Sequence, residues 1–288
     1  MERISSRQNA IVKRFRDLAR ASRTVTSAGH SGEVLLDGEH LVEEALACDI
    51  PVEIAAFSDK QLNNVLSPVA RIAKDIKKRG GRVLTVTEPV LAAMSPVQHA
   101  SGVVAIARAR PTEVRVVMAT VTDLPLVLVL AGLQDPGNVG AIIRAAAAFG
   151  ASGVVAIEGS ANPFSWKALR GGMGGTFRLP IAARGSLSEV VASARELGVR
   201  LIAAVPRGGT PLPKVDLREP TAIVLGGEGA GVSAATMAAV QETVTIPMQA
   251  RVESLNVAIA AALILYEATR QRQGIGEAPS PGRRGVRA

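Results

Sequence analysis

In the second half of the chain, short apolar runs of strand length alternate with longer segments of helical length. The alternation begins near Leu126 and continues through Val154–Ile157, Leu201–Val205 and Ala222–Gly226, with stretches of helical length between these runs. Strands that alternate with helices in this way favour a parallel sheet covered by helices. The pattern therefore predicts an α/β domain over residues 126–272.

The first half of the chain has a similar alternation on a smaller scale. Residues 4–22, 38–48 and 68–79 are helix-like, and residues 52–57 and 82–87 are strand-like. We expect these elements to form a separate, smaller α/β domain over residues 1–108.

Pro111 and Pro125 bracket a Val-rich segment between the two patterns. Because proline interrupts regular structure, we interpret residues 109–125 as a linker, with a further strand inside it as the alternative. Residues 273–288 are rich in Gly, Pro and Arg. They are predicted to form a flexible basic tail.

Three segments of the second half place Gly-rich or polar turns before Ala-rich helices. They run over Leu126–Gly150, Thr221–Ser233 and Ile246–Arg272. Ligands of open parallel sheets bind beyond the carboxyl ends of the strands, so these turns predict one shared pocket. A dinucleotide-binding loop is a weak alternative, because GGEGAG at 226–231 departs from G-x-G-x-x-G.

Polar residues stand at the joints of two of these segments. Asn138 is predicted to cap the helix of the first segment, in which Arg144 is the only charge before Gly150. A buried charge must be paired or chemically active; a structural ion pair is one reading of Arg144, and binding of phosphate or a developing oxyanion is the other. Ser254 and Asn256 precede the last helix, where Ser254 either caps it or helps to hold a polar ligand.

Composition narrows the class of protein. The 288 residues are 48% hydrophobic and 20% charged, which indicates a folded chain with one or two cores. No run approaches the ~18 apolar residues of a membrane span. The single cysteine, Cys48, fits a reducing cytoplasm, and three scattered histidines argue against a metal site.

The positive charge is concentrated at the two ends. Residues 1–30 hold seven basic side chains against two acidic ones, and the tail from Gln273 holds three arginines against one glutamate, so the ends supply nearly all of the net +8. Helically spaced basic residues favour contact with a phosphate backbone, and a solvated face is the alternative. The candidate RNA contacts are Arg7, Lys13, Arg14 and Arg20.

The order and the amino-acid sequences of the three segments strongly resemble the signature motifs of the SPOUT superfamily. They are most similar to its SpoU/TrmH branch, which consists of S-adenosylmethionine-dependent RNA 2′-O-ribose methyltransferases. The N-terminal runs ISSRQNAIVKRFRDLA and GEVLLDGEHLVEEAL match the family's RNA substrate-binding domain more faintly. The resemblance implies a parallel-sheet domain with a trefoil knot, preceded by a smaller α/β sandwich. It also implies a cytoplasmic homodimer that uses S-adenosylmethionine, needs no metal and acts on RNA.

The resemblance also assigns roles to residues. Arg144 matches the arginine that activates the ribose hydroxyl, and Asn138 and Glu228 match an asparagine and a glutamate that face the site. Ser254 and Asn256 match the pair near substrate and cofactor. Positions that cradle the cofactor match Leu225, Gly226, Gly227, Ile246, Met248 and Leu255.

Relatives with the N-terminal domain act mostly on ribosomal RNA, so the resemblance implies a 23S-type substrate. Methylation of tRNA and antibiotic-resistance methylation of ribosomal RNA are alternatives with the same chemistry. A non-catalytic RNA-binding ribosome factor is an alternative of another class. The presence of all five polar site residues argues against it, namely Asn138, Arg144, Glu228, Ser254 and Asn256. One departure concerns KALRGGMGGTFRLP, where Gly172 replaces the family's usual serine; we expect a lost polar contact on the RNA side.

Overall fold

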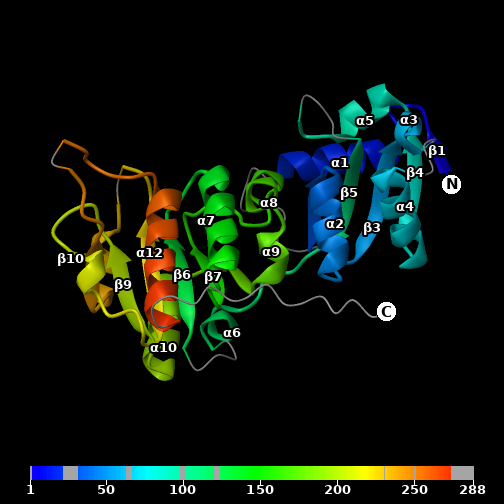
Figure 1. The fold of residues 1–288 in the computed structure, drawn as a ribbon. Helices are drawn as coiled ribbons and strands as arrows, with labels where there is room; N and C mark the ends of the chain where they lie inside the picture. Colours follow the sequence, from blue (N-terminus) through cyan, green and yellow to red (C-terminus); the bar gives the residue numbers. More distant parts are fainter. Residues whose placement is uncertain are drawn as a thin grey trace, which may run out of the picture.

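The protein folds into two α/β domains joined side by side (Figure 1). The computed structural model describes residues 2–21, 32–62, 67–97, 102–119, 124–229, 231–249 and 251–273. Each half of the chain forms an α/β unit.

The N-terminal domain is a three-layer sandwich around one mixed sheet. Its strands run in the order β1-β4-β3-β5-β2, and β5 is antiparallel to β2 and β3. Two separate cores lie on the two faces of the sheet, one beneath α2 and α4 and the other beneath α1 and α5. The strands are β1 (Glu2–Ile4), β2 (Glu33–Asp37), β3 (Val52–Ser58), β4 (Arg82–Val86) and β5 (Val103–Arg108). The helices are α1 (Ala10–Ala21), α2 (Glu39–Ala47), α3 (Asp59–Leu62), α4 (Pro68–Lys78) and α5 (Glu88–Met94).

The C-terminal domain is built on a parallel sheet with strand order β10-β12-β9-β11-β6-β7-β8. The strands are β6 (Leu126–Ala131), β7 (Gly153–Ile157), β8 (Ile181–Gly185), β9 (Arg200–Ala204), β10 (Thr210–Pro211), β11 (Thr221–Gly226) and β12 (Glu242–Thr245). The helices are α6 (Val114–Met118), α7 (Pro136–Ala148), α8 (Trp166–Gly172), α9 (Gly175–Arg178), α10 (Leu187–Leu197), α11 (Ala234–Ala239) and α12 (Val257–Arg272), with a 3₁₀ turn at Leu212–Lys214.

Strand β6 shows why the central strands read as uninterrupted apolar runs. Leu128 and Leu130 belong to the core beneath α7 and α12, whereas Val127 and Val129 belong to the core beneath α6 and α10. Because helices cover both faces of the sheet, no position of the strand reaches water. The predicted fold class is confirmed, while the trefoil knot stays a prediction.

The segment predicted as a linker contributes to this second domain. Residues 114–118 form helix α6, and Val114, Val117 and Met118 pack in the core on one face of the C-terminal sheet. Residues 114–118 are therefore helical, not the further strand considered as an alternative, because these apolar positions follow helical spacing. The predicted tail beyond Gln273 lies outside the described residues.

Helices α8 and α9 join the two domains (Figure 1). Leu169 of α8 belongs to the core of the N-terminal domain, and Arg178 of α9 pairs with Glu44 of α2. On its other side α8 lies against α7, where a Cβ on Gly140 would sit 2.3 Å from the carbonyl oxygen of Ala168. Glycine at 140 therefore lets the two helix backbones touch and ties the N-terminal domain to the helix that carries Asn138 and Arg144.

Candidate active site

A cavity of about 710 Å³ opens at the carboxyl ends of β9, β11 and β12 and at the start of α12. This is the edge of the sheet that the three segments predict. The cavity is lined by every residue predicted for the cofactor, namely Leu225, Gly226, Gly227, Ile246, Met248 and Leu255. Glu228, Ser254 and Asn256 line it as well.

The sequence alone missed three apolar residues that line this cavity. Val244, Ala260 and Ile264 also line it. Ala260 and Ile264 follow Asn256 at intervals of four residues, so they lie on the same face of α12. That spacing from a polar residue already in the site was the available signal.

Glycines shape the loop after β11. A Cβ on Gly227 would lie 2.3 Å from the carbonyl oxygen of Gly132, and one on Gly226 would lie 2.3 Å from the carbonyl carbon of Gly231. The loop closes on itself, with the Gly231 N–H donating to the Gly227 carbonyl at 3.0 Å. Only glycine fits these approaches, so the rim of the cavity is backbone at these positions.

A chain of hydrogen bonds links the three segments. The Asn256 side-chain oxygen accepts from the N–H groups of Ala258 and Ile259 at 2.9 and 3.3 Å, which leaves its Nδ2 to donate to Asn138 Oδ1 at 3.1 Å. Asn138 in turn donates through Nδ2 to the Glu228 carboxylate. The start of α12 therefore sets the direction of both amides and holds Glu228 at the site.

The predicted cap of Asn138 is wrong, and of the two readings of Ser254 the cap is not the one found. Helix α7 is capped by Asp135, which accepts from the Gly137 N–H at 3.0 Å, and Pro136 begins the helix. Asn138 lies one turn further on, where its amide is free for the chain of hydrogen bonds. Asn256 caps α12, and Ser254 is exposed at the rim of the cavity.

Arg144 is exposed on α7, so the prediction that it is buried is wrong. Its neighbours Ile142, Ile143 and Ala146 carry the buried face of the helix. Within the described residues Arg144 makes no hydrogen bond or ion pair, and it does not line the cavity. The structural ion pair considered from the sequence is therefore not found among these residues, and the guanidinium is available to a ligand.

Comparison with known proteins identifies this arrangement. Residues 125–266 match the model of the SpoU rRNA Methylase family, and residues 35–112 match the model described as RNA 2′-O ribose methyltransferase substrate binding. The chain belongs to the SpoU rRNA methylase family. It is a methyltransferase with a substrate-binding domain at its N-terminal end.

Individual SpoU proteins align along almost their whole length. The chain is 35% identical to an uncharacterized tRNA/rRNA methyltransferase of Synechocystis, covering 93% of this chain and 94% of the relative. It is 32% identical to the 23S rRNA (guanosine(2553)-2′-O)-methyltransferase of Bacillus subtilis, covering 92% and 98%. The crystal structure of an AdoMet-bound rRNA methyltransferase from Sinorhizobium meliloti superposes with a TM-score of 0.80 at 29% identity, covering 93% and 97%. These relatives support the prediction of S-adenosylmethionine as cofactor.

One of the four predicted RNA contacts is engaged in ion pairs inside the N-terminal domain. Arg14 pairs with Glu33 and, at 2.9 Å, with Glu53, so its side chain is only 37% exposed and ties α1 to two strands. The assignment of Arg14 to RNA is therefore withdrawn. Lys13 and Arg20 remain exposed, and the sequence reasoning missed Arg16, which lies between them on the outer face of α1.

Arg7, the fourth predicted contact, is exposed beside α5. Its Nε donates to the Pro89 carbonyl at 3.1 Å, which leaves the terminal nitrogens of the guanidinium outside that bond. Arg7 therefore stays in the candidate RNA surface.

Gly172, the departure from the family pattern, does not face RNA. It is buried at the end of α8, and a Cβ there would lie 3.2 Å from the Thr176 Oγ1 and 3.6 Å from the Gly140 carbonyl oxygen. The predicted loss of an RNA contact is wrong, because this position points into the packing against α7. Thr176 Oγ1 is itself buried without a hydrogen-bond partner among the described residues.

The described ranges of this SpoU protein hold no group of three or more side chains suited to a metal ion. In the same ranges no helix has the length and apolarity needed to cross a membrane.

Proposed function

We propose that this enzyme transfers the methyl group of S-adenosylmethionine to the 2′-hydroxyl of one nucleotide in 23S ribosomal RNA. The observation that carries the proposal is the chain of hydrogen bonds from Asn256 through Asn138 to Glu228, at the mouth of a cavity in a SpoU fold. The 32% identity to the Bacillus subtilis 23S rRNA enzyme over 92% of the chain supports the choice of RNA. An RNA substrate is also consistent with the cytoplasmic location that we expect from the sequence.

The cavity fits the cofactor chemically. Its apolar side, with Leu225, Val244 and Ile264, suits the adenine ring, and the backbone of the glycine loop and of Ile246 offers hydrogen bonds to polar groups. When bound, the cofactor supplies an electrophilic methyl group on a sulfonium. The residues of the chain must then hold the ribose hydroxyl in line and stabilise the charge that develops on it.

Arg144 is the residue to which we assign that stabilisation. A guanidinium stays protonated at any physiological pH, so it is poorly suited to remove a proton. It is well suited to hold a phosphate or an alkoxide by two parallel hydrogen bonds. Arg144 is exposed on α7, and its guanidinium has no hydrogen bond or ion pair within the described residues.

We assign Glu228 to the orientation of the substrate. Its Oε1 accepts from Asn138, and Oε2 has no partner among the described residues. A carboxylate held in this way accepts a hydrogen bond from a hydroxyl or an amino group of the target nucleotide.

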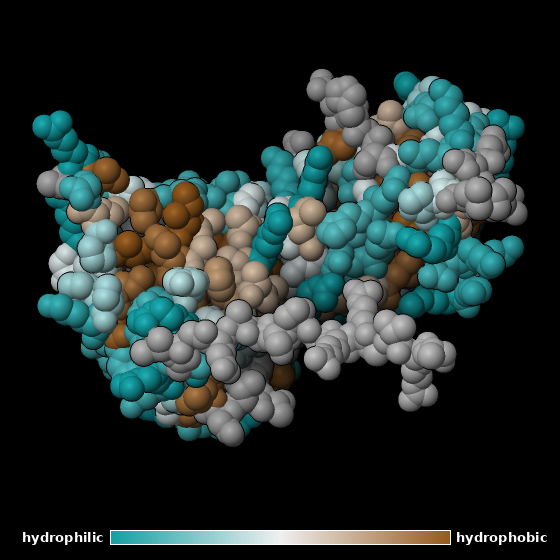
Figure 2. All heavy atoms as spheres, in the orientation of Figure 1, coloured by the Kyte–Doolittle hydropathy of each residue, from teal (hydrophilic) through white to brown (hydrophobic). Residues whose placement is uncertain are grey.

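A homodimer is part of the proposal. Ile259, Leu263 and Tyr266 are 53%, 40% and 56% exposed and follow one another along a single face of α12. Figure 2 shows hydrophobic surface gathered where α12 lies in Figure 1. An apolar stripe of this kind supports burial against a second copy of the chain.

The experiment that tests the proposal compares 2′-O-methyl marks on total RNA from cells with and without the gene. We expect one mark to disappear from 23S ribosomal RNA. Loss of a mark from tRNA instead would select the tRNA alternative, and no lost mark would favour the non-catalytic factor. A mark whose absence changes only antibiotic sensitivity would select the resistance alternative.

Replacement of Arg144 tests the assignment within the site. Arg144→Ala should bind S-adenosylmethionine with unchanged affinity while single-turnover methylation falls by about 10²- to 10³-fold, as for other lost transition-state contacts. Arg144→Lys should restore little, because an ammonium cannot form the two parallel bonds. Near-normal methylation by Arg144→Ala would remove the arginine from the mechanism.

A further inference from the structure

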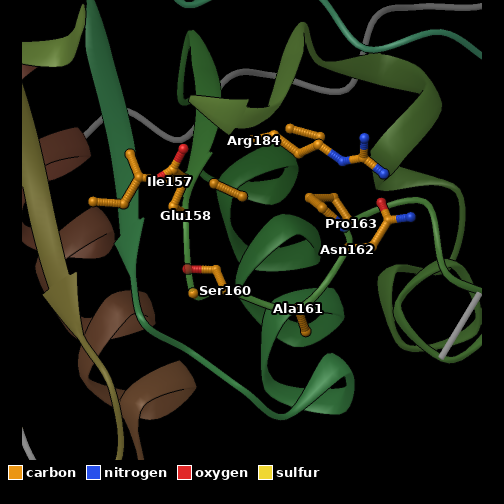
Figure 3. A pocket seen from close by; sticks show the side chains of 10 residues that line it. Ile157, Glu158, Ser160, Ala161, Asn162, Pro163 and Arg184 are labelled. Atoms are coloured by element: carbon orange, nitrogen blue, oxygen red, sulfur yellow. The ribbon is translucent and has the colours of Figure 1, made fainter. Parts of the chain in front are cut away.

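A second hollow, of about 280 Å³, lies at the carboxyl ends of β7 and β8, outside the cofactor cavity. Its polar lining residues are Glu158, Ser160, Asn162 and Arg184, and its apolar lining includes Ile157, Pro163 and Ala183. Figure 3 shows Arg184 extending over Pro163 toward Asn162, with Glu158 well apart from the guanidinium. Neither Glu158 nor Arg184 makes an ion pair or hydrogen bond through its side chain within the part of the chain that the structure describes.

The hollow is continuous with the active site. A cleft of about 500 Å³ along the same edge of the sheet shares Gly227 and Glu228 with the cofactor cavity and shares Glu158 and Gly159 with the hollow. The groove crosses the ends of β11, β6, β7 and β8, which are consecutive strands. Three strand spacings amount to roughly 14 Å, a distance that a few nucleotides of extended RNA cover.

Arg184 is held in this groove by a strained backbone. Its φ is +65°, and the pairing of β7 with β8 slips by one residue between Ala183 and Gly185. Arg184 is thus the extra residue of a β-bulge, a device that turns a side chain to a new direction. The left-handed conformation is unfavourable for any residue with a Cβ. Gly185 restores the pairing, because its carbonyl accepts from the Glu158 N–H at 2.9 Å.

The side chain of Asn162 also has a fixed orientation in the hollow. Its Oδ1 accepts from the Phe164 N–H at 2.9 Å, so the direction of the amide is set. The Nδ2 group, which has no partner among the described residues, is left as a donor near Arg184. Two donors at one end of the hollow suit a phosphate, whereas the Glu158 carboxylate at the other end repels one and accepts from N–H groups.

We propose that this hollow binds a nucleotide of the RNA that flanks the methylated one, with its phosphate on Arg184 and Asn162 and the donor edge of its base on Glu158. The inference rests on the proposed function, since it requires an RNA substrate in the adjoining cavity. A free phosphate fits less well, because it carries nothing for Glu158 to accept. A nucleotide carries both the negative charge and the donors that the two ends require.

The test measures binding to in vitro transcribed 23S ribosomal RNA fragments over a range of salt concentrations, for the full-length protein and three variants. Arg184→Ala should weaken binding about tenfold and lower the log–log salt slope by ~0.7, the value for one phosphate contact on single-stranded RNA. Arg195→Ala is the matched control, because Arg195 is exposed on α10 and lines none of the three cavities. Asn162→Ala should weaken binding without a change in slope.

Two further variants separate this role from a structural one. Arg184→Gly relieves the positive φ, so it should melt at an equal or higher temperature while it binds RNA as weakly as Arg184→Ala. Glu158→Gln should reduce the preference for the substrate fragment over a scrambled fragment by about threefold, because repulsion of misplaced phosphates is lost. Equal binding by Arg184→Ala and Arg195→Ala would overturn the inference. A wild-type protein that binds and methylates no fragment would instead overturn the proposed function.

Discussion

The hydrogen-bonded chain between the three segments has a direction, and that direction can be tested. Asn256 turns its oxygen to the N–H groups of α12 and its Nδ2 to Asn138. Aspartate at 256 would still cap the helix, but its second oxygen would face Asn138 Oδ1, an acceptor 3.1 Å from the present donor. Asn138 would have to turn, and its oxygen would then face Glu228. Aspartate therefore keeps the cap and breaks the chain, whereas alanine removes both.

The two variants should differ in stability and agree in activity. Asn256→Ala loses a helix cap, worth about 1 kcal/mol, and an amide hydrogen bond, worth about 1 kcal/mol. We expect a loss of about 2 kcal/mol for alanine and about 1 kcal/mol for aspartate, which retains the cap. Both variants release Glu228, so methylation should fall by a similar factor of at least ~10.

Urea unfolding and single-turnover methylation at saturating cofactor and RNA measure these two quantities. The control is Ser186→Ala, which removes the cap of α10 and should cost about 1 kcal/mol with full activity. Wild-type methylation by Asn256→Asp would refute the reasoning, because the direction of the chain would then be irrelevant to catalysis.

Three further predictions concern stability. The Arg272 guanidinium donates to four backbone carbonyls in residues 124–125 and 217–219, so Arg272→Ala should cost about 2–3 kcal/mol in urea unfolding, with little recovery by lysine. Burial raises the pKa of Glu53, but hydrogen bonds from Arg108 and Arg14 hold it below its ordinary value of 4.5. This stabilisation is present above pH 4.5 and is lost as pH falls through the lower folded-state value, so Glu53→Gln should be less stable than wild type at neutral pH and the two should converge in acid titration. Gly172→Ser offers a partner to the buried Thr176 hydroxyl and should raise stability by about 1 kcal/mol, a gain that Gly172→Ala should not reproduce in full.

The sequence by itself determined the fold class, and its family resemblance identified many of the residues that line the cavity, though not Val244, Ala260 or Ile264. Apolar runs such as Leu126–Ala131 are buried on both faces, and their uninterrupted apolar sequence indicates this burial. In a parallel sheet every strand ends at the same edge, so the loops after β11 and before α12 had to meet. The two turns could therefore be placed at one pocket without coordinates, whereas Leu225, Ile246, Met248 and Leu255 were named individually through the family resemblance.

The tertiary structure alone decided what each polar side chain does. Glu228 and Asn256 lie 90 and 118 positions after Asn138 along the chain. The residues that bind the Asn138 side chain therefore leave no signal in the sequence around it. Arg14 likewise pairs with Glu33 and Glu53, which lie 19 and 39 positions away in the sequence. The exposure of Arg144 depends on which face of α7 meets the sheet. Local patterns report burial and backbone preference, whereas the partner of a charged or amide group is set by elements that folding brings together from distant parts of the chain.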